Sequence, residues 1–278
     1  MKLGGKLYEE CPDHESWIAA MRRHGYSAAY CPITADADDS VVLAYERAAA
    51  SAGFVIAEVG VWNNPLSRDE ATRQTAIEHC KRQLDLADRL GARCAVNIAG
   101  SRGEKWDGPG PDDLTPEAFD MIVELVRNVI DSVKPTRTYY ALETMPWMYP
   151  NSAEDYTRLI KAIDRKQFAV HFDPVNLICS PERYFRNGEL IGDFIAKLGP
   201  HIRSCHAKDV LLHPNFLVHL DEVRPGTGTL DFRTLLREIA KLDPDTPLMM
   251  EHMKSEEEYS LAAEYIRSVA GEVGVKFG

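Results

Sequence analysis

Short apolar runs alternate with amphipathic segments along the whole chain, and this pattern predicts strands that are each followed by a helix. The runs are rich in Val, Ile, Tyr, Phe and Ala, as expected for strands buried on both faces of a parallel sheet. Flanking Gly, Pro, Asn and Asp residues separate them from the helical segments. The eight predicted strands cover residues 2–8, 27–33, 54–61, 94–99, 139–144, 167–173, 202–208 and 247–252.

Helix start and stop signals lie between these strands. Ser67-Arg-Asp-Glu70 has the spacing of a capping box, and the helix that it opens is expected to run to about Leu90, before Gly91. Thr115-Pro116 places a cap and a first-turn proline before an apolar stripe at helical spacing. Ser255-Glu-Glu-Glu258 is a second capping box and predicts the start of the last helix.

Eight strand–helix units predict an α/β protein with a single (β/α)8 TIM barrel over residues 1–278. The main alternative is an open doubly wound sheet, which usually carries a Gly-rich phosphate loop after its first strand. Gly4-Gly5 instead lies inside the first predicted strand. Two connections, 100–114 and 210–228, are longer than the rest. Both follow the carboxyl end of a strand, where barrel enzymes build their active sites.

Composition and charge narrow the class of partner. The chain is 45% hydrophobic and carries a formal net charge of −11, which argues against binding to nucleic acid or an anionic membrane. No apolar run has the length of a membrane span or the form of a signal peptide. The six cysteines contain no Cys-x-x-Cys pair, as is usual for reduced thiols. We therefore expect a cytoplasmic protein with a small-molecule partner.

Four consecutive strand–helix units carry a carboxylate or an imidazole at the strand end. These residues are Glu143, Asp173, His206 and Glu251. Any one acid there is more often a helix cap or a salt-bridge partner. Four of them would converge on one rim of the barrel, and buried carboxylates without a cation are costly. This oxygen-rich set favours one divalent metal ion, with Mn first and Mg, Co or Zn as alternatives.

Two further side chains share the inward face of these strand ends. Lys208 lies two residues after His206, where it either polarises a substrate carbonyl or forms a structural salt bridge. His171 lies two residues before Asp173, where it either orients a ligand or fills a layer of the barrel core. Asp209 should point the other way and act as a hinge or cap residue.

The predicted loops at the same end supply candidate substrate contacts. Trp62, Trp106 and Trp147 follow strands three, four and five, where their rings suit the apolar faces of a sugar or simply pack the loops. Asn97 either binds a sugar hydroxyl or closes a turn. Arg224, before Pro-Gly-Thr-Gly, either contacts a phosphate or belongs to a tight turn.

The chain resembles the xylose isomerase-like TIM barrels, which include sugar phosphate isomerase/epimerases, ketose 3-epimerases, inosose dehydratases and endonuclease IV. The resemblance covers nearly the whole chain. It is most specific in Leu-Glu143, Phe-Asp173-Pro-x-Asn176, His206-x-Lys208-Asp209, Pro225-Gly-Thr-Gly228 and Glu251. It implies that Glu143, Asp173, His206 and Glu251 bind the metal. It also implies that the two glutamates act as acid and base on either side of a bound sugar, and that the chain can form a homo-oligomer.

Three positions depart from the ketose 3-epimerases within this resemblance. Asn176 stands where they carry a histidine, Leu212 where they carry an arginine, and Tyr149 where they carry an acid. The metal site therefore carries over, whereas the substrate clamp does not, and Asn176 remains a candidate substrate contact.

These features together predict a divalent-metal-dependent isomerase or epimerase of a sugar or keto-sugar. Glu143 or Glu251 would abstract a proton beside a carbonyl to give an enediolate, and the other would return it. The alternative is a metal-dependent lyase or dehydratase acting on a keto-sugar or inosose. An abasic-site endonuclease is less favoured, because the chain is acidic and most of its nine histidines fall away from strand ends.

Overall fold

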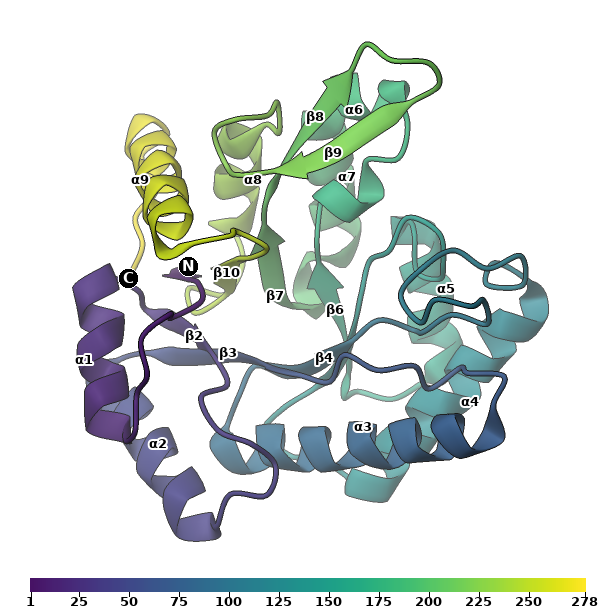
Figure 1. Ribbon diagram of the computed structural model, residues 1–278, viewed down its shortest axis with the longest axis horizontal. Helices are drawn as coiled ribbons and strands as arrows, with labels where there is room; N and C mark the ends of the chain where they lie inside the picture. The colour runs from purple at the N-terminus through teal and green to yellow at the C-terminus, as the bar shows by residue number, and fades with distance from the viewer.

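The computed structural model describes residues 1–278, and its centre is a closed barrel of parallel strands (Figure 1). Neighbouring strands follow the order β1-β10-β7-β6-β5-β4-β3-β2, so the predicted TIM barrel is confirmed. The barrel strands are β1 (Lys2–Gly4), β2 (Ala28–Tyr30), β3 (Val55–Gly60), β4 (Cys94–Asn97), β5 (Tyr140–Glu143), β6 (Phe168–Phe172), β7 (Ile202–Ala207) and β10 (Pro247–Met250).

Helices surround the barrel and pack their apolar faces against it. They are α1 (His14–His24), α2 (Asp39–Ala52), α3 (Glu70–Leu90), α4 (Pro116–Val133), α5 (Ala153–Ile163), the short α6 (Pro181–Phe185), α7 (Asn187–Leu198), α8 (Phe232–Ile239) and α9 (Glu256–Glu272). The two chain ends meet, because the Gly278 N–H donates to the Met1 carbonyl at 3.1 Å. No helix is both long and apolar enough to span a membrane.

The helix caps agree with the sequence in two of the three predicted cases. Thr115 and Ser255 are the N-caps of α4 and α9, and each side chain accepts a backbone N–H of the first turn. The prediction for Ser67 is wrong, because α3 begins at Glu70 with Asp69 as its N-cap. The Asp69 carboxylate accepts the Thr72 N–H at 2.8 Å, which is the contact of an N-cap. Ser67 lies two residues before this cap and does not accept the Thr72 N–H.

The sequence did not predict a β-hairpin in the long connection after β7. Antiparallel strands β8 (Asp209–His213) and β9 (His219–Val223) extend beyond the barrel, in green at the top of Figure 1. The residues of β9, His-Leu-Asp-Glu-Val, are mostly polar. The connection between the two strands also lacks the Asn-Gly or Asp-Gly signal of a tight hairpin, so the segment has the composition of a loop.

Asp209 anchors this hairpin and the turn before α8. Its Oδ1 accepts the N–H groups of Val210 and Leu230 at 2.8 Å, and its Oδ2 accepts those of Gly226 and Gly228 at 3.0 Å. The side chain is buried, as are its contacts with the Val210 and Leu230 amides, so these two N–H groups have no water to replace it. The capping role predicted for Asp209 therefore takes the form of four backbone contacts.

We expect Asp209→Asn to lower the free energy of unfolding by about 2–4 kcal/mol, because an amide NH2 would face two of the four N–H donors. Urea denaturation followed by circular dichroism measures this change. Asp221→Asn is the matched control: Asp221 lies on exposed β9, and surface substitutions usually stay within about 0.5 kcal/mol. Equal stabilities of the two variants would contradict the anchoring role.

Candidate metal centre

The four predicted ligands meet at the carboxyl end of the barrel. Glu143 ends β5, His206 lies in β7, and Asp173 and Glu251 directly follow β6 and β10. One ligand atom from each residue lies within 4.8 Å of those of the other three. The register of the closed barrel thus brings together residues that are up to 108 positions apart (251 − 143).

The carboxylates converge on a single nitrogen. His206 Nδ1 lies 2.9 Å from Glu143 Oε1, 2.9 Å from Glu251 Oε1 and 3.8 Å from Asp173 Oδ2. An imidazole nitrogen carries at most one hydrogen, so it cannot satisfy three carboxylate oxygens. Asp173 Oδ2 and Glu251 Oε1 are buried and have no hydrogen-bond donor with suitable geometry. Buried oxygen atoms around one imidazole fit a divalent cation.

Lys208 supplies positive charge beside this cluster. Its Nζ lies 2.6 Å from Glu251 Oε1, 2.9 Å from Asp173 Oδ2 and 3.1 Å from Glu222 Oε2. Burial acts to lower the pKa of Lys208, but Asp173 and Glu251 outweigh it and raise the pKa well above its usual value. Lys208 therefore remains an ammonium group, and the salt bridges predicted as one of its two roles are present.

The two glutamates differ in their tendency to ionise. Burial raises the pKa of Glu143, and Glu251 adds to the effect by repulsion. Burial acts in the same direction on Glu251, but the charges of His206 and Lys208 outweigh it and lower the pKa of Glu251. The same cluster thus shifts the pKa values of the two glutamates in opposite directions.

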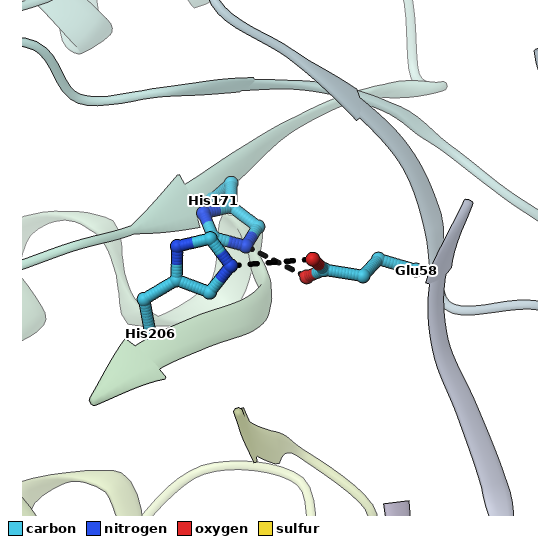
Figure 2. A group of neighbouring side chains, drawn as sticks. All are labelled: Glu58, His171 and His206. Atoms are coloured by element: carbon cyan, nitrogen blue, oxygen red, sulfur yellow. Dashed lines mark hydrogen bonds and ion pairs between the residues drawn. The ribbon is translucent and has the colours of Figure 1, made fainter. Parts of the chain in front are cut away.

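Beneath the cluster lies a buried carboxylate, Glu58 of β3, which the sequence reasoning missed. Figure 2 shows the carboxylate of Glu58 facing the rings of His171 and His206, which lie next to each other and point toward it from β6 and β7. The Nε2 atoms of the two rings lie 2.8 and 3.2 Å from its oxygens. Burial acts to raise the pKa of Glu58, but the two histidines lower it below its usual value. The available signal was an acid inside the otherwise apolar run 54–61.

A cavity of about 840 Å³ opens above the four ligands. Trp62, Trp106 and Trp147 all line it, together with Glu143, Asn176, Lys208 and Glu251. The Trp147 indole N–H donates to the Asp107 carbonyl at 3.0 Å and so joins the loops after β4 and β5. The Trp62 indole packs against Gly60, where any side chain would collide with it.

The family model of the xylose isomerase-like TIM barrel matches residues 12–269. The chain belongs to this family. None of the curated protein sequences matches it significantly.

Solved structures share the fold of this xylose isomerase-like barrel at low sequence identity. A D-psicose 3-epimerase from Clostridium cellulolyticum H10, solved with D-tagatose, has 16% identity and a TM-score of 0.69 over 99% of this chain and 100% of that chain. A 3-keto-D-glucoside 4-epimerase from E. coli has 15% identity and a TM-score of 0.66 over 96% and 99%. A xylose isomerase-like protein from Mycobacterium smegmatis in complex with magnesium has 18% identity and a TM-score of 0.65 over 95% and 90%.

Three predicted substrate contacts do not line the main cavity of this xylose isomerase-like barrel. Asn97 is fully buried, and its side chain donates to Asn63 Oδ1 at 2.9 Å and accepts the Asn63 N–H at 3.2 Å, so it joins the end of β4 to the segment after β3. His171 lies below the metal cluster, against Glu58. Arg224 pairs with Glu258 at 3.1 Å and lines a smaller neighbouring cavity. Asn97 and His171 are both fully buried and do not belong to the residues that line the cavity.

The hairpin adds a residue that the sequence did not suggest. Glu222 of β9 lines the cavity, where it contacts Lys208 and accepts from His252 Nδ1 at 2.9 Å. This contact with Glu222 raises the pKa of His252, which also lines the cavity. An acid on a polar strand carries no signal of its own, because exposed β9 positions are expected to be charged.

Proposed function

We propose that this xylose isomerase-like barrel is a divalent-metal-dependent isomerase or epimerase of a sugar or keto-sugar. The observation that carries the proposal is the convergence of Glu143, Asp173 and Glu251 on His206 Nδ1 at the floor of the main cavity. The resemblance in fold to a D-psicose 3-epimerase and a 3-keto-D-glucoside 4-epimerase supports it.

A divalent ion held by these four side chains would act as a Lewis acid on a substrate carbonyl. The donor set of three carboxylates and one imidazole suits Mn²⁺, with Mg²⁺, Co²⁺ and Zn²⁺ as alternatives. The complex of the Mycobacterium smegmatis protein with magnesium supports a divalent ion in this fold.

The two glutamates would carry out the proton transfers. They come from β5 and from the end of β10, which are not neighbours in the barrel, so they reach a bound sugar from different sides. Glu251, whose pKa is lowered, would accept the proton beside the carbonyl and leave an enediolate. Glu143, whose pKa is raised, would return a proton to the other face. The Lys208 ammonium lies beside Glu251 and would stabilise the negative charge on the enediolate.

The cavity wall has the chemistry of a sugar site. Trp62, Trp106 and Trp147 present aromatic faces for the apolar face of a sugar ring. Asn176 donates to Glu143 Oε1 at 3.3 Å and to the Thr144 carbonyl at 3.0 Å, so it would orient the acid as well as contact substrate. Together they would bind a small polar ring against the two glutamates.

Elemental analysis of the purified protein, followed by a screen of ketoses, keto-sugars and inososes in D2O, tests the proposal. Isomerisation through an enediolate should place solvent deuterium at the reacting carbon of one of these compounds, which NMR detects. A protein that holds no divalent ion and exchanges no proton in any of the three classes would refute it.

A lyase is the second candidate, because the side chains at the epimerase clamp positions are different here. Tyr149, in place of an acid, donates its hydroxyl to the Leu114 carbonyl at 3.1 Å. The same proton abstraction followed by loss of a β-hydroxyl or glycosyl group would give an enone. An absorbing product in the same screen would favour elimination over isomerisation.

Chelation should destabilise the protein. Mn²⁺ at about 100 times its Kd would add about 2.7 kcal/mol to the folded state, and for a chain of this size that is roughly 5–10 °C in Tm. Differential scanning fluorimetry with EDTA and then with added Mn²⁺ measures the change. Asp173→Asn is the control variant, because its Oδ1 can still accept the Val175 and Asn176 N–H groups while Oδ2 is lost as a ligand. Added Mn²⁺ should raise the Tm of wild type and leave that of the variant unchanged, whatever the Tm of each metal-free protein, and an Mn²⁺-independent Tm in wild type would argue against the site.

A further inference from the structure

We propose that Glu58 is a positioning residue of the metal centre, whose carboxylate fixes the ring of His206 so that Nδ1 faces the other three ligands. The inference rests on the proposed function, because it assumes that these four residues bind a divalent ion. It concerns a residue of β3, a strand that contributes no ligand to the centre.

Glu58 has no packing reason to be an acid. Its neighbours Ile56, Ala57 and Val59 are buried apolar residues, and Glu58 itself is 1% exposed. Burying a carboxylate costs several kcal/mol unless it is paired and hydrogen-bonded. A charged side chain in the interior of the barrel therefore indicates that its partners there have a specific use.

All three polar partners of Glu58 can donate to it. The Nε2 atoms of His206 and His171 lie 3.2 and 2.8 Å from its oxygens (Figure 2). The Ser204 hydroxyl lies at 3.0 Å. An ionised carboxylate only accepts hydrogen bonds, so it holds the hydrogen of His206 on Nε2. Nδ1, on the opposite side of the ring, is then the nitrogen whose lone pair would serve an ion held between it and the carboxylates of Glu143 and Glu251, each 2.9 Å from Nδ1.

The remaining contacts show which group orients which. His171 Nδ1 is buried without a hydrogen-bond partner, so Glu58 is the polar contact of that ring. His171 and Ser204 thus hold the carboxylate of Glu58, and Glu58 holds His206. His206 is the member of this group that also belongs to the metal cluster.

Glu58, His171 and His206 could instead bind a second ion, since their ligand atoms also lie within 4.8 Å of one another. That ion would need the Nε2 lone pair of His206 while the first ion used Nδ1, so one imidazolate would bridge two dications. Each chain would then bind two ions, whereas positioning by Glu58 predicts one. Metal stoichiometry therefore separates the two arrangements.

Isothermal titration calorimetry of the metal-free protein with Mn²⁺ tests the proposal. The visible spectrum of the Co²⁺-loaded protein is the second measurement. Glu58→Gln keeps the size of the side chain, but its carbonyl can accept from only one imidazole. We expect Glu58→Gln to weaken Mn²⁺ binding by about 10- to 100-fold and to change the Co²⁺ spectrum. Glu58→Leu should bind Mn²⁺ more weakly still. Glu257→Gln is the matched control, because it makes the same change at an exposed position that does not contact Glu58 or the metal cluster.

The outcomes separate this inference from the proposed function. One Mn²⁺ per chain with equal affinity in wild type and in Glu257→Gln, with weaker binding in folded Glu58→Gln, supports positioning. Unchanged affinity and an unchanged Co²⁺ spectrum in folded Glu58→Gln would overturn it while leaving the metal centre intact. Two ions in wild type and one in Glu58→Gln would replace it with a second metal site. A wild type that binds no ion would overturn both the centre and the role of Glu58.

Discussion

Glu251→Gln should leave the barrel folded and lower turnover by at least about 10²–10⁴-fold, the usual contribution of a general base. The substitution keeps the size of a side chain that is almost fully buried, so the packing around β10 is preserved. An amide cannot accept the substrate proton. The substitution also removes the negative charge that lies 2.6 Å from Lys208 Nζ and 2.9 Å from His206 Nδ1.

Turnover is best followed as solvent deuterium incorporation into the substrate found by screening, at a Mn²⁺ concentration that saturates the variant. Saturation separates loss of the base from loss of a metal ligand. Glu257→Gln is the matched control, since it makes the same change at an exposed position six residues further on. Its rate should equal that of the wild type. Substantial deuterium incorporation by Mn²⁺-saturated Glu251→Gln would remove Glu251 from the proton transfer.

The convergence of the four ligand residues was predictable because it depends on strand order alone. Once Glu143, Asp173, His206 and Glu251 are assigned to consecutive strand ends, closure of any (β/α)8 barrel brings them to one rim. Burial of the strands adds the cost of unpaired carboxylates, which favours a cation. Neither step requires knowledge of side-chain contacts.

Contacts across the barrel interior were not predictable in the same way. Glu58 reaches His206 because β3 faces β7 through the barrel, and that distance depends on strand tilt and on register shifts such as the one between Val170 and His171. Asn97 ends β4 on the same rim of the barrel as the four ligands, yet its side chain is buried and contacts Asn63. Sequence periodicity assigns the face of a strand, but it does not say which residue on the opposite strand is reached.

The charge balance of the site gives Lys208 a role that the sequence left undecided. Three carboxylates lie within 3.1 Å of its ammonium nitrogen, and Lys208 itself is 2% exposed. In the metal-free protein it compensates charge that a divalent ion would otherwise compensate. The stability of a variant at this position should therefore depend on metal, which a residue acting only on substrate would not show.

Lys208→Met should lower the free energy of unfolding of the metal-free protein by about 3–5 kcal/mol, because it leaves Asp173 and Glu251 buried without their cation. Saturating Mn²⁺ should reduce this loss, since the ion neutralises the same carboxylates. Urea denaturation with EDTA and with Mn²⁺ measures both values.

Lys241→Met is the control for the loss of Lys208. The Lys241 side chain is 65% exposed and pairs with Glu238 at the end of α8, so the change should stay within about 0.5 kcal/mol under both conditions. An equally small loss for Lys208→Met without metal would show that the salt bridges do not hold the site together. Lys208 would then be left with the polarisation of a substrate carbonyl as its role, and the turnover of the same variant would measure that contribution directly.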